Sequence, residues 1–139
     1  VKKATVADIE KDDKLIFGMS TVDKDTWKAT KSNVDWADFF HEISKTRSEG
    51  KTIAIFGLGD HITYAATFVD HIGLLANELI NNGAVLTGQV DADEYEYHES
   101  ESVVDGKFLG LPVDEDFEPE LTDERLEKWV KQISPDFRF

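Results

Sequence analysis

Three short apolar runs along the chain predict buried β-strands. They span residues 13–19, 51–59 and 83–90, and a glycine lies at or near the end of each of the first two. Hydrophobic side chains fill both alternating sets of positions in each run, rather than one set. Strands of this kind are covered on both faces, which is the environment of a parallel sheet between helices.

Helical periodicity lies between and after these runs. Apolar residues recur at helical spacing over residues 34–43, 64–79 and 121–133. We expect the second helix to stop at Asn82-Gly83, and the third to use Thr122 or Asp123 as its N-cap. Because strands and helices alternate along the chain, the pattern predicts an α/β fold.

Two loops follow the first two predicted strands, and both are rich in small and polar residues. Their sequences are GMSTVDKDTW, residues 18–27, and GLGDHITY, residues 57–64. Ligands of open α/β sheets bind outside the carboxyl ends of the strands. These loops are therefore the predicted functional region of a chain whose length suits a single domain over residues 1–139.

The acidic composition limits the classes of partner. Fifteen basic residues oppose 29 acidic ones, which gives a net charge of −14. This field repels nucleic acids and anionic membrane surfaces, whereas it favours salt-sensitive encounters with basic protein faces. Solubility alone is the commoner reason for such a charge, so both interpretations stay open.

Composition also bears on compartment and chemistry. The chain has no cysteine, which excludes disulfides, thiolate metal sites and cysteine nucleophiles. No apolar stretch reaches the length of a membrane span, and residues 1–11 lack the hydrophobic core of a signal peptide. We therefore expect no membrane association and a cytoplasmic location.

The sequence gives little support for a catalytic site or a metal-binding site. The four histidines show no metal-ligand spacing with one another. Residues 91–101 are acidic but lack the glycine of an EF-hand calcium loop, so we interpret them as a solvated loop. No serine lies in a nucleophile-elbow pattern, and we expect neither an enzyme nor a metal site.

Three motifs together resemble one family. Residues 105–133, DGKFLGLPVDEDFEPELTDERLEKWVKQI, are similar to the region after the insertion that splits the last strand of long-chain flavodoxins. Residues 35–40, DWADFF, resemble the start of that family's third helix, and residues 56–73 resemble the loop after its fourth strand. The resemblance covers residues 13 to 137 and implies a flavodoxin-like three-layer sandwich around a parallel sheet.

The resemblance implies electron transfer through FMN. It implies that Gly57, Leu58, Gly59 and Asp60 cradle the flavin and that Tyr64 stacks on it. A flat aromatic side chain suits the broad flavin ring, and glycines let the backbone approach the polar edge of the ring. From the residues alone a second interpretation stays open, in which the glycines only turn the chain and Tyr64 packs on the helix that follows.

The loop after the first strand departs from the family. The resemblance assigns Ser20, Thr21 and Val22 to the flavin site, but Val22 stands where the family usually has a tryptophan that covers the ring. Residues 23–33 lengthen this loop. Trp27 lies within that addition and is a candidate substitute for the missing indole.

The N-terminal part of the family's pattern has no counterpart in the 139 residues, which resemble it from near its second helix onward. The unmatched part includes the first strand and the phosphate loop. A nanomolar site is worth about −12 kcal/mol, and losing about four charge-assisted hydrogen bonds at about 1.5 kcal/mol each leaves roughly −6 kcal/mol. We therefore expect a compromised phosphate site and little tightly bound FMN.

Two further expectations follow from this departure. The alternative function is a flavodoxin-like remnant that binds no cofactor and acts as an interaction or structural domain. Without the first strands of the family, residues 14–19 form a sheet edge with unpaired backbone groups, which predicts a homodimer through that edge. The other expected partners are redox proteins with basic faces.

Overall fold

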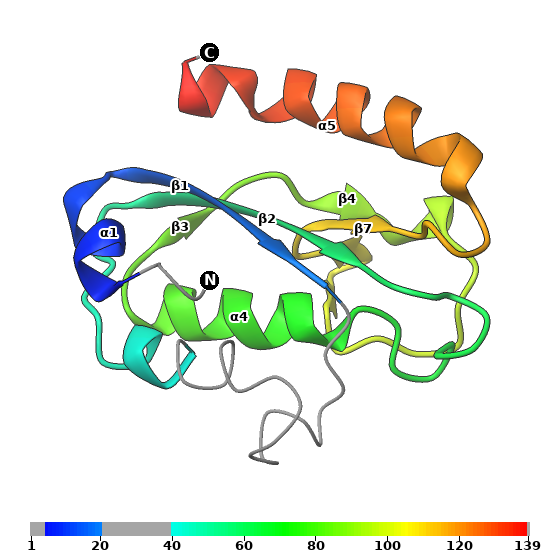
Figure 1. The fold of residues 1–139 in the computed structure, drawn as a ribbon, viewed down its shortest axis with the longest axis horizontal. Coiled ribbons are helices and arrows are strands. Elements are labelled where there is room, and N and C mark those ends of the chain that lie inside the picture. The colour runs from blue at the N-terminus through cyan, green and yellow to red at the C-terminus, as the bar shows by residue number, and fades with distance from the viewer. Residues whose placement is uncertain (1–4, 21–39, 139) are drawn as a thin grey trace.

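The computed structural model describes residues 5–20 and 40–138 (Figure 1). The larger elements are helices α1 (Val6–Lys11), α4 (Asp70–Asn81) and α5 (Thr122–Phe137), and strands β1 (Lys14–Met19), β2 (Thr52–Leu58) and β7 (Leu111–Val113). The shorter strands are β3 (Val85–Leu86), β4 (Val90–Asp91), β5 (Val103–Val104) and β6 (Lys107–Phe108). Two short 3₁₀ turns, η1 (Ala92–Glu94) and η2 (Pro119–Leu121), are also described.

A parallel sheet is built around β2. Strand β1 pairs along the length of β2, from Lys14 opposite Thr52 to Met19 opposite Gly57. Strand β3 pairs with the beginning of β2, and β7 pairs with its end. Because β1 occupies one edge of β2, β3 and β7 share the other edge and act as one interrupted strand. This confirms the split last strand that the resemblance implied.

The interruption is a separate small sheet. Between β3 and β7 the chain forms an antiparallel sheet in the order β4-β6-β5. Gly88, with φ +84°, turns the chain away from the main sheet, and its carbonyl accepts a hydrogen bond from Trp129 Nε1 at 2.8 Å. The third predicted strand was therefore too long, since only Val85–Leu86 of residues 83–90 pair with β2.

Helices cover both faces of the main sheet, with α4 on one side and α5 on the other (Figure 1). Ile53 and Ile55 of β2 belong to the buried cluster that includes α4, whereas Ala54 belongs to the cluster that includes Trp129 and Ile133 of α5. All three β2 side chains are buried. The α/β three-layer prediction is confirmed, and β2 is covered on both faces as its sequence predicted.

The same prediction is wrong for β1. Phe17 and Met19 are buried, but the Ile16 side chain, which points to the opposite face, is 42% exposed. The hydrophobic pattern of a strand records which side chains are apolar, and it does not supply the element that covers them.

The helix predicted over residues 64–79 begins later than expected, at Asp70. Residues 61–69 form turns instead, and Val69 adopts a left-handed conformation with φ +47° immediately before the helix. The turn begins because Asp60 Oδ1 accepts hydrogen bonds from the amides of Ile62 and Thr63. The predicted stop is confirmed, since α4 ends at Asn81 and Gly83 follows with φ +97°.

The last helix differs from the prediction at both ends. Its N-cap position is Leu121, because the turn η2 leads directly into it, so neither Thr122 nor Asp123 is the cap. The helix continues to Phe137, beyond the predicted end at residue 133. Of the helix predicted over residues 34–43, only residues 40–43 are described, and they are helical. No helix of the described residues is long and apolar enough to cross a membrane.

Candidate functional site

The carboxyl ends of β1, β2 and β7 meet at one edge of the sheet. Met19 lies opposite Gly57, and Leu58 lies opposite Val113. The loops that leave these three strands therefore start side by side, which is the ligand-binding position of open α/β sheets. The second predicted loop and Ser20, the first residue after β1, are both at this edge.

Gly57, near the end of β2, and Gly59, just after it, are required by helix packing. A Cβ on Gly57 would lie 2.6 Å from His71 Nε2 and 2.8 Å from Ile72 Cγ1, and a Cβ on Gly59 would lie 2.5 Å from Val69 Cγ1. Such distances are too short for real side chains, so these glycines let the start of α4 approach β2. The prediction that they allow a flavin to approach is a separate claim, and it stays a prediction.

Asp60 shapes the loop that follows. Its Oδ1 accepts hydrogen bonds from Ile62 N at 3.0 Å and Thr63 N at 2.8 Å, and its backbone carbonyl accepts one from Tyr64 N at 3.2 Å. Desolvation acts to raise the pKa of Asp60, but the hydrogen bonds from Thr63 and Ile62 hold that pKa below its usual value. The Asp60 carboxylate is therefore a structural group that sets the conformation of the loop.

Tyr64 lies in this turn and not on the helix. Its side chain is 49% exposed. Tyr64 therefore does not begin the helix, as the second interpretation required, because α4 begins at Asp70. A half-exposed aromatic ring beside the carboxyl end of a central strand suits a flat apolar ligand, because such a ligand would cover it.

Three more apolar side chains are exposed at this edge of the sheet. They lie in the loops after β2 and β7 or at the end of β2, and they are Leu58, Ile62 and Phe117. This edge of the sheet therefore presents a partly apolar surface to solvent, which fits the flavin ring and its surroundings.

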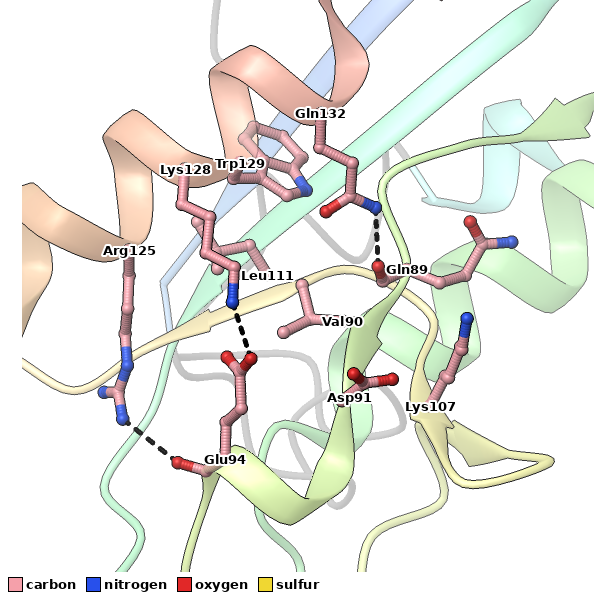
Figure 2. Close-up of a pocket in the computed structure, with 10 residues that line it drawn as sticks. All are labelled: Gln89, Val90, Asp91, Glu94, Lys107, Leu111, Arg125, Lys128, Trp129 and Gln132. Carbon is pink, nitrogen blue, oxygen red and sulfur yellow. Dashed lines mark hydrogen bonds and ion pairs between the residues drawn. The ribbon is translucent and has the colours of Figure 1, made fainter.

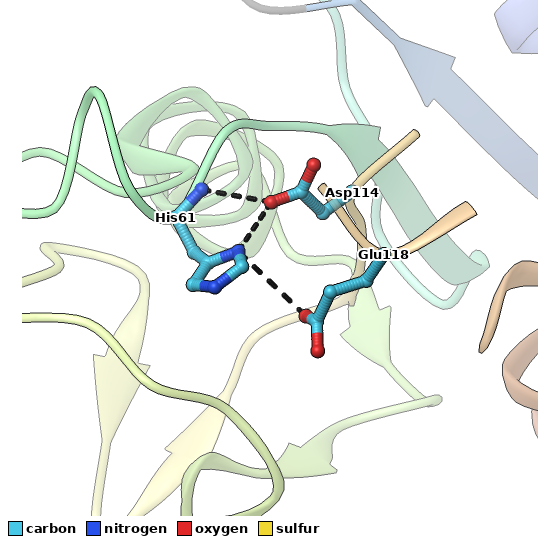
Figure 3. A group of neighbouring side chains, drawn as sticks. All are labelled: His61, Asp114 and Glu118. Carbon is cyan, nitrogen blue, oxygen red and sulfur yellow. Dashed lines mark hydrogen bonds and ion pairs between the residues drawn. The ribbon is translucent and has the colours of Figure 1, made fainter. Parts of the chain in front are cut away.

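A buried carboxylate joins the loop after β2 to the loop after β7. Asp114 Oδ2 accepts a hydrogen bond from His61 N at 3.0 Å and also contacts His61 Nδ1 (Figure 3). Asp114 Oδ1 accepts hydrogen bonds from the amides of Asp116 and Phe117. Burial acts to raise the pKa of Asp114, but hydrogen bonds from His61 and Phe117 hold it below its usual value.

Sequence reasoning did not identify Asp114 or its contact with His61. The two residues are 53 positions apart, and no spacing rule connects them. The only local signal was the acidic turn DED, residues 114–116, directly after an apolar run. Of the other predicted site residues, Ser20 is exposed, whereas Thr21, Val22 and Trp27 lie outside the described residues.

A cavity of about 240 Å³ lies elsewhere, between α5 and the small sheet (Figure 2). Two charged side chains in its walls form an ion pair, with Lys128 Nζ 2.7 Å from Glu94 Oε1. Gln132 Nε2 donates to Gln89 O at 2.7 Å on the opposite side. None of the residues that line this cavity belongs to the loops of the predicted flavin site.

Comparison with known proteins gives consistent results. The flavodoxin family model matches residues 1–129. The chain is 39% identical over 134 residues to the flavodoxin of Haemophilus influenzae, which covers 96% of this chain and 74% of that protein. It is 38% identical over 135 residues to flavodoxin 1 of Escherichia coli K12, with the same shares of 96% and 74%.

A solved structure supports the same relationship. The crystal structure of Fusobacterium nucleatum flavodoxin bound to flavin mononucleotide aligns with a TM-score of 0.82 at 26% sequence identity. The alignment covers 93% of this chain and 74% of that one.

Proposed function

We propose that this chain, which belongs to the flavodoxin family, carries electrons between redox partners through bound FMN. Flavodoxins are electron carriers and not enzymes, and FMN is the cofactor of the aligned F. nucleatum structure. When bound, FMN supplies the electron chemistry, and the protein supplies binding, orientation and the surrounding charge. Family membership favours this function over a cofactor-free interaction domain.

The observation that carries the proposal is the half-exposed Tyr64 at the carboxyl end of β2. In the proposed site Tyr64 stacks on the flavin, and the backbone from Gly57 to Asp60 faces the polar edge of the ring. Ser20, Thr21 and Val22 contribute from the loop after β1. The loop is held in place by the Asp60 turn and by the hydrogen bond from His61 N to Asp114, so Tyr64 is positioned before a ligand arrives.

The proposed partners are redox proteins with basic faces. The net charge is −14, and the loop after β7, beside the proposed site, adds the exposed acidic side chains of Glu115 and Asp116. Negative charge beside the proposed flavin site would steer a basic partner toward that site. It would also make the encounter sensitive to salt. A single domain over residues 1–139 and a cytoplasmic location also stay predictions.

Titration of the desalted chain with FMN tests the function. We expect saturable quenching of flavin fluorescence with a Kd of tens of micromolar, which corresponds to a binding free energy of roughly −6 kcal/mol. Riboflavin, which lacks the phosphate, is the matched control and should bind with similar affinity. Absence of saturable binding by either flavin up to the millimolar range would contradict the proposal.

A further inference from the structure

We infer that His61, Asp114 and Glu118 form a binding site for one divalent transition-metal ion such as Zn²⁺. Each residue offers one ligand atom, and the three atoms lie within 4.8 Å of one another (Figure 3). The histidine comes from the loop after β2 and the two carboxylates come from the loop after β7. The inference rests on this geometry and does not depend on the proposed flavin function.

The distances suit a shared ion. His61 Nδ1 and Glu118 Oε1 are 3.7 Å apart. Two ligands that each lie about 2.1 Å from a tetrahedral metal are about 3.4 Å from each other. Asp114 Oδ2 already faces the same ring nitrogen, so an ion that replaces the proton between them requires the two atoms to move apart. Rotation of the His61 ring about its Cβ–Cγ bond would provide this movement.

Asp114 keeps one position for an ion. A carboxylate oxygen has about two lone-pair sites. The amides of Asp116 and Phe117 occupy those of Oδ1, and His61 N occupies one of those of Oδ2. The remaining site of Oδ2 faces His61 Nδ1, where the ion would lie. Because backbone amides fix this buried carboxylate, it would enter the complex without losing conformational freedom.

Glu118 supplies the second carboxylate from a more open position. Its Oε1 accepts a hydrogen bond from Arg125 Nη1 at 3.2 Å, and its other oxygen makes no hydrogen bond to the described residues. The Glu118 and His61 side chains are 25% and 11% exposed, respectively. Solvent can therefore reach the site, which gives an ion an entry path and leaves room for water ligands.

The charge of the cluster favours a dication. Asp60 adds a third carboxylate to those of Asp114 and Glu118, because it is close enough to interact unfavourably with Asp114. Arg125 is the one cation that contacts the cluster among the described residues. Three negative charges and one positive charge leave a net charge of about −2, which a divalent ion would neutralise. An imidazole with two carboxylates favours Zn²⁺ and neighbouring transition metals over Ca²⁺ and Mg²⁺, which prefer oxygen ligands alone.

Calorimetric titration of the chelator-treated chain with ZnCl₂, without FMN, tests the inference. We expect one saturable site, with one Zn²⁺ bound per chain, because the three ligand atoms lie close enough to share a single ion. Co²⁺ as a spectroscopic substitute should give visible absorption bands of the bound ion. His61→Gln keeps a donor for Asp114 and should weaken Zn²⁺ binding at least tenfold, and Glu118→Gln should also weaken it.

The matched control is His41→Gln, which removes an exposed histidine outside the cluster. This variant should bind Zn²⁺ as the parent chain does, and circular dichroism should confirm that all variants are folded. The inference is wrong if the parent chain shows no saturable site, if His61→Gln and Glu118→Gln bind Zn²⁺ like the parent, or if His41→Gln loses affinity to the same extent.

Discussion

At the residue scale, His71 combines burial with a missing hydrogen bond. Its side chain lies at the start of α4 with 2% exposure, and Nε2 has no hydrogen-bond partner among the described residues. Burial lowers the pKa of His71 to about 4, from a usual value of 6.5. The folded chain therefore holds His71 in its neutral form under conditions in which the unfolded chain would protonate it.

This predicts a loss of stability in mild acid. The contribution of neutral His71 to the free energy of unfolding is complete above pH 6.5. It is lost progressively as the pH falls toward 4, because only the unfolded state binds the proton in that window. At pH 5 the loss is about 2 kcal/mol. Urea unfolding at pH 7.5 and pH 5 measures it. In His71→Leu, the difference in the free energy of unfolding between pH 7.5 and pH 5 should be smaller by about this amount. A difference as large as that of the parent chain would contradict the assignment.

Tyr64 allows a test of the proposed site that is separate from stability. Because its ring is half exposed, Tyr64→Ala should leave the melting temperature nearly unchanged. We expect it to weaken FMN binding several-fold, since aromatic stacking contributes about 0.5–1.5 kcal/mol beyond burial. Trp27→Ala is the comparison and should have the smaller effect. A larger loss of FMN affinity in Trp27→Ala would show that residues 23–33 supply the stacking side chain.

At the element scale, the site depends on how closely α4 approaches β2. The start of α4 packs against the end of β2 at Gly57, where no side chain fits. The same helix begins only after the turn that presents Tyr64. The position of the proposed stacking residue is therefore coupled to a helix–strand contact.

Gly57→Ala tests this coupling. The added methyl would lie 2.6 Å from His71 Nε2 and 2.8 Å from Ile72 Cγ1, so α4 or its side chains would have to shift. Overpacking of this kind should lower the free energy of unfolding by about 1–3 kcal/mol. Denaturant unfolding measures the change. A variant as stable as the parent would show that the contact is loose, and the packing explanation of Gly57 would then fail.

At the scale of the whole molecule, β1 is an edge strand of the described sheet. Among the described residues nothing pairs with the outer edge of β1, and Ile16 is 42% exposed beside it. An apolar strand edge of this kind is a template for pairing with another chain. We therefore propose a homodimer in which two β1 edges pair about a two-fold axis.

Light scattering at micromolar concentration should show this dimer, and Ile16→Lys should shift the chain to monomer, since a charge on an edge strand opposes pairing. Val104→Lys is the matched control, because Val104 is also an exposed, apolar, β-branched strand residue but lies in the small antiparallel sheet. It should leave the mass unchanged. A monomeric parent chain whose melting temperature does not depend on concentration would contradict the proposal.

The sequence by itself determined the features that depend on neighbouring residues. The apolar runs located β1 and β2, and Asn82-Gly83 marked the end of α4, because the apolar character of a strand and the termination of a helix are decided within a few positions. The motifs in residues 35–40, 56–73 and 105–133 were enough to indicate the family. The helical spacing from Tyr64 onward, by contrast, predicted the start of α4 wrongly, because the Asp60 turn delays the helix by six residues.

Only the tertiary structure decided which distant groups meet. It joined His61 to Asp114 across 53 residues, placed β3 and β7 on one edge of β2, and left Ile16 exposed on a strand whose sequence predicted burial on both faces. It also showed that Gly57 makes room for His71. These outcomes depend on the packing of whole elements against each other. Side-chain type and spacing along the chain do not contain that information.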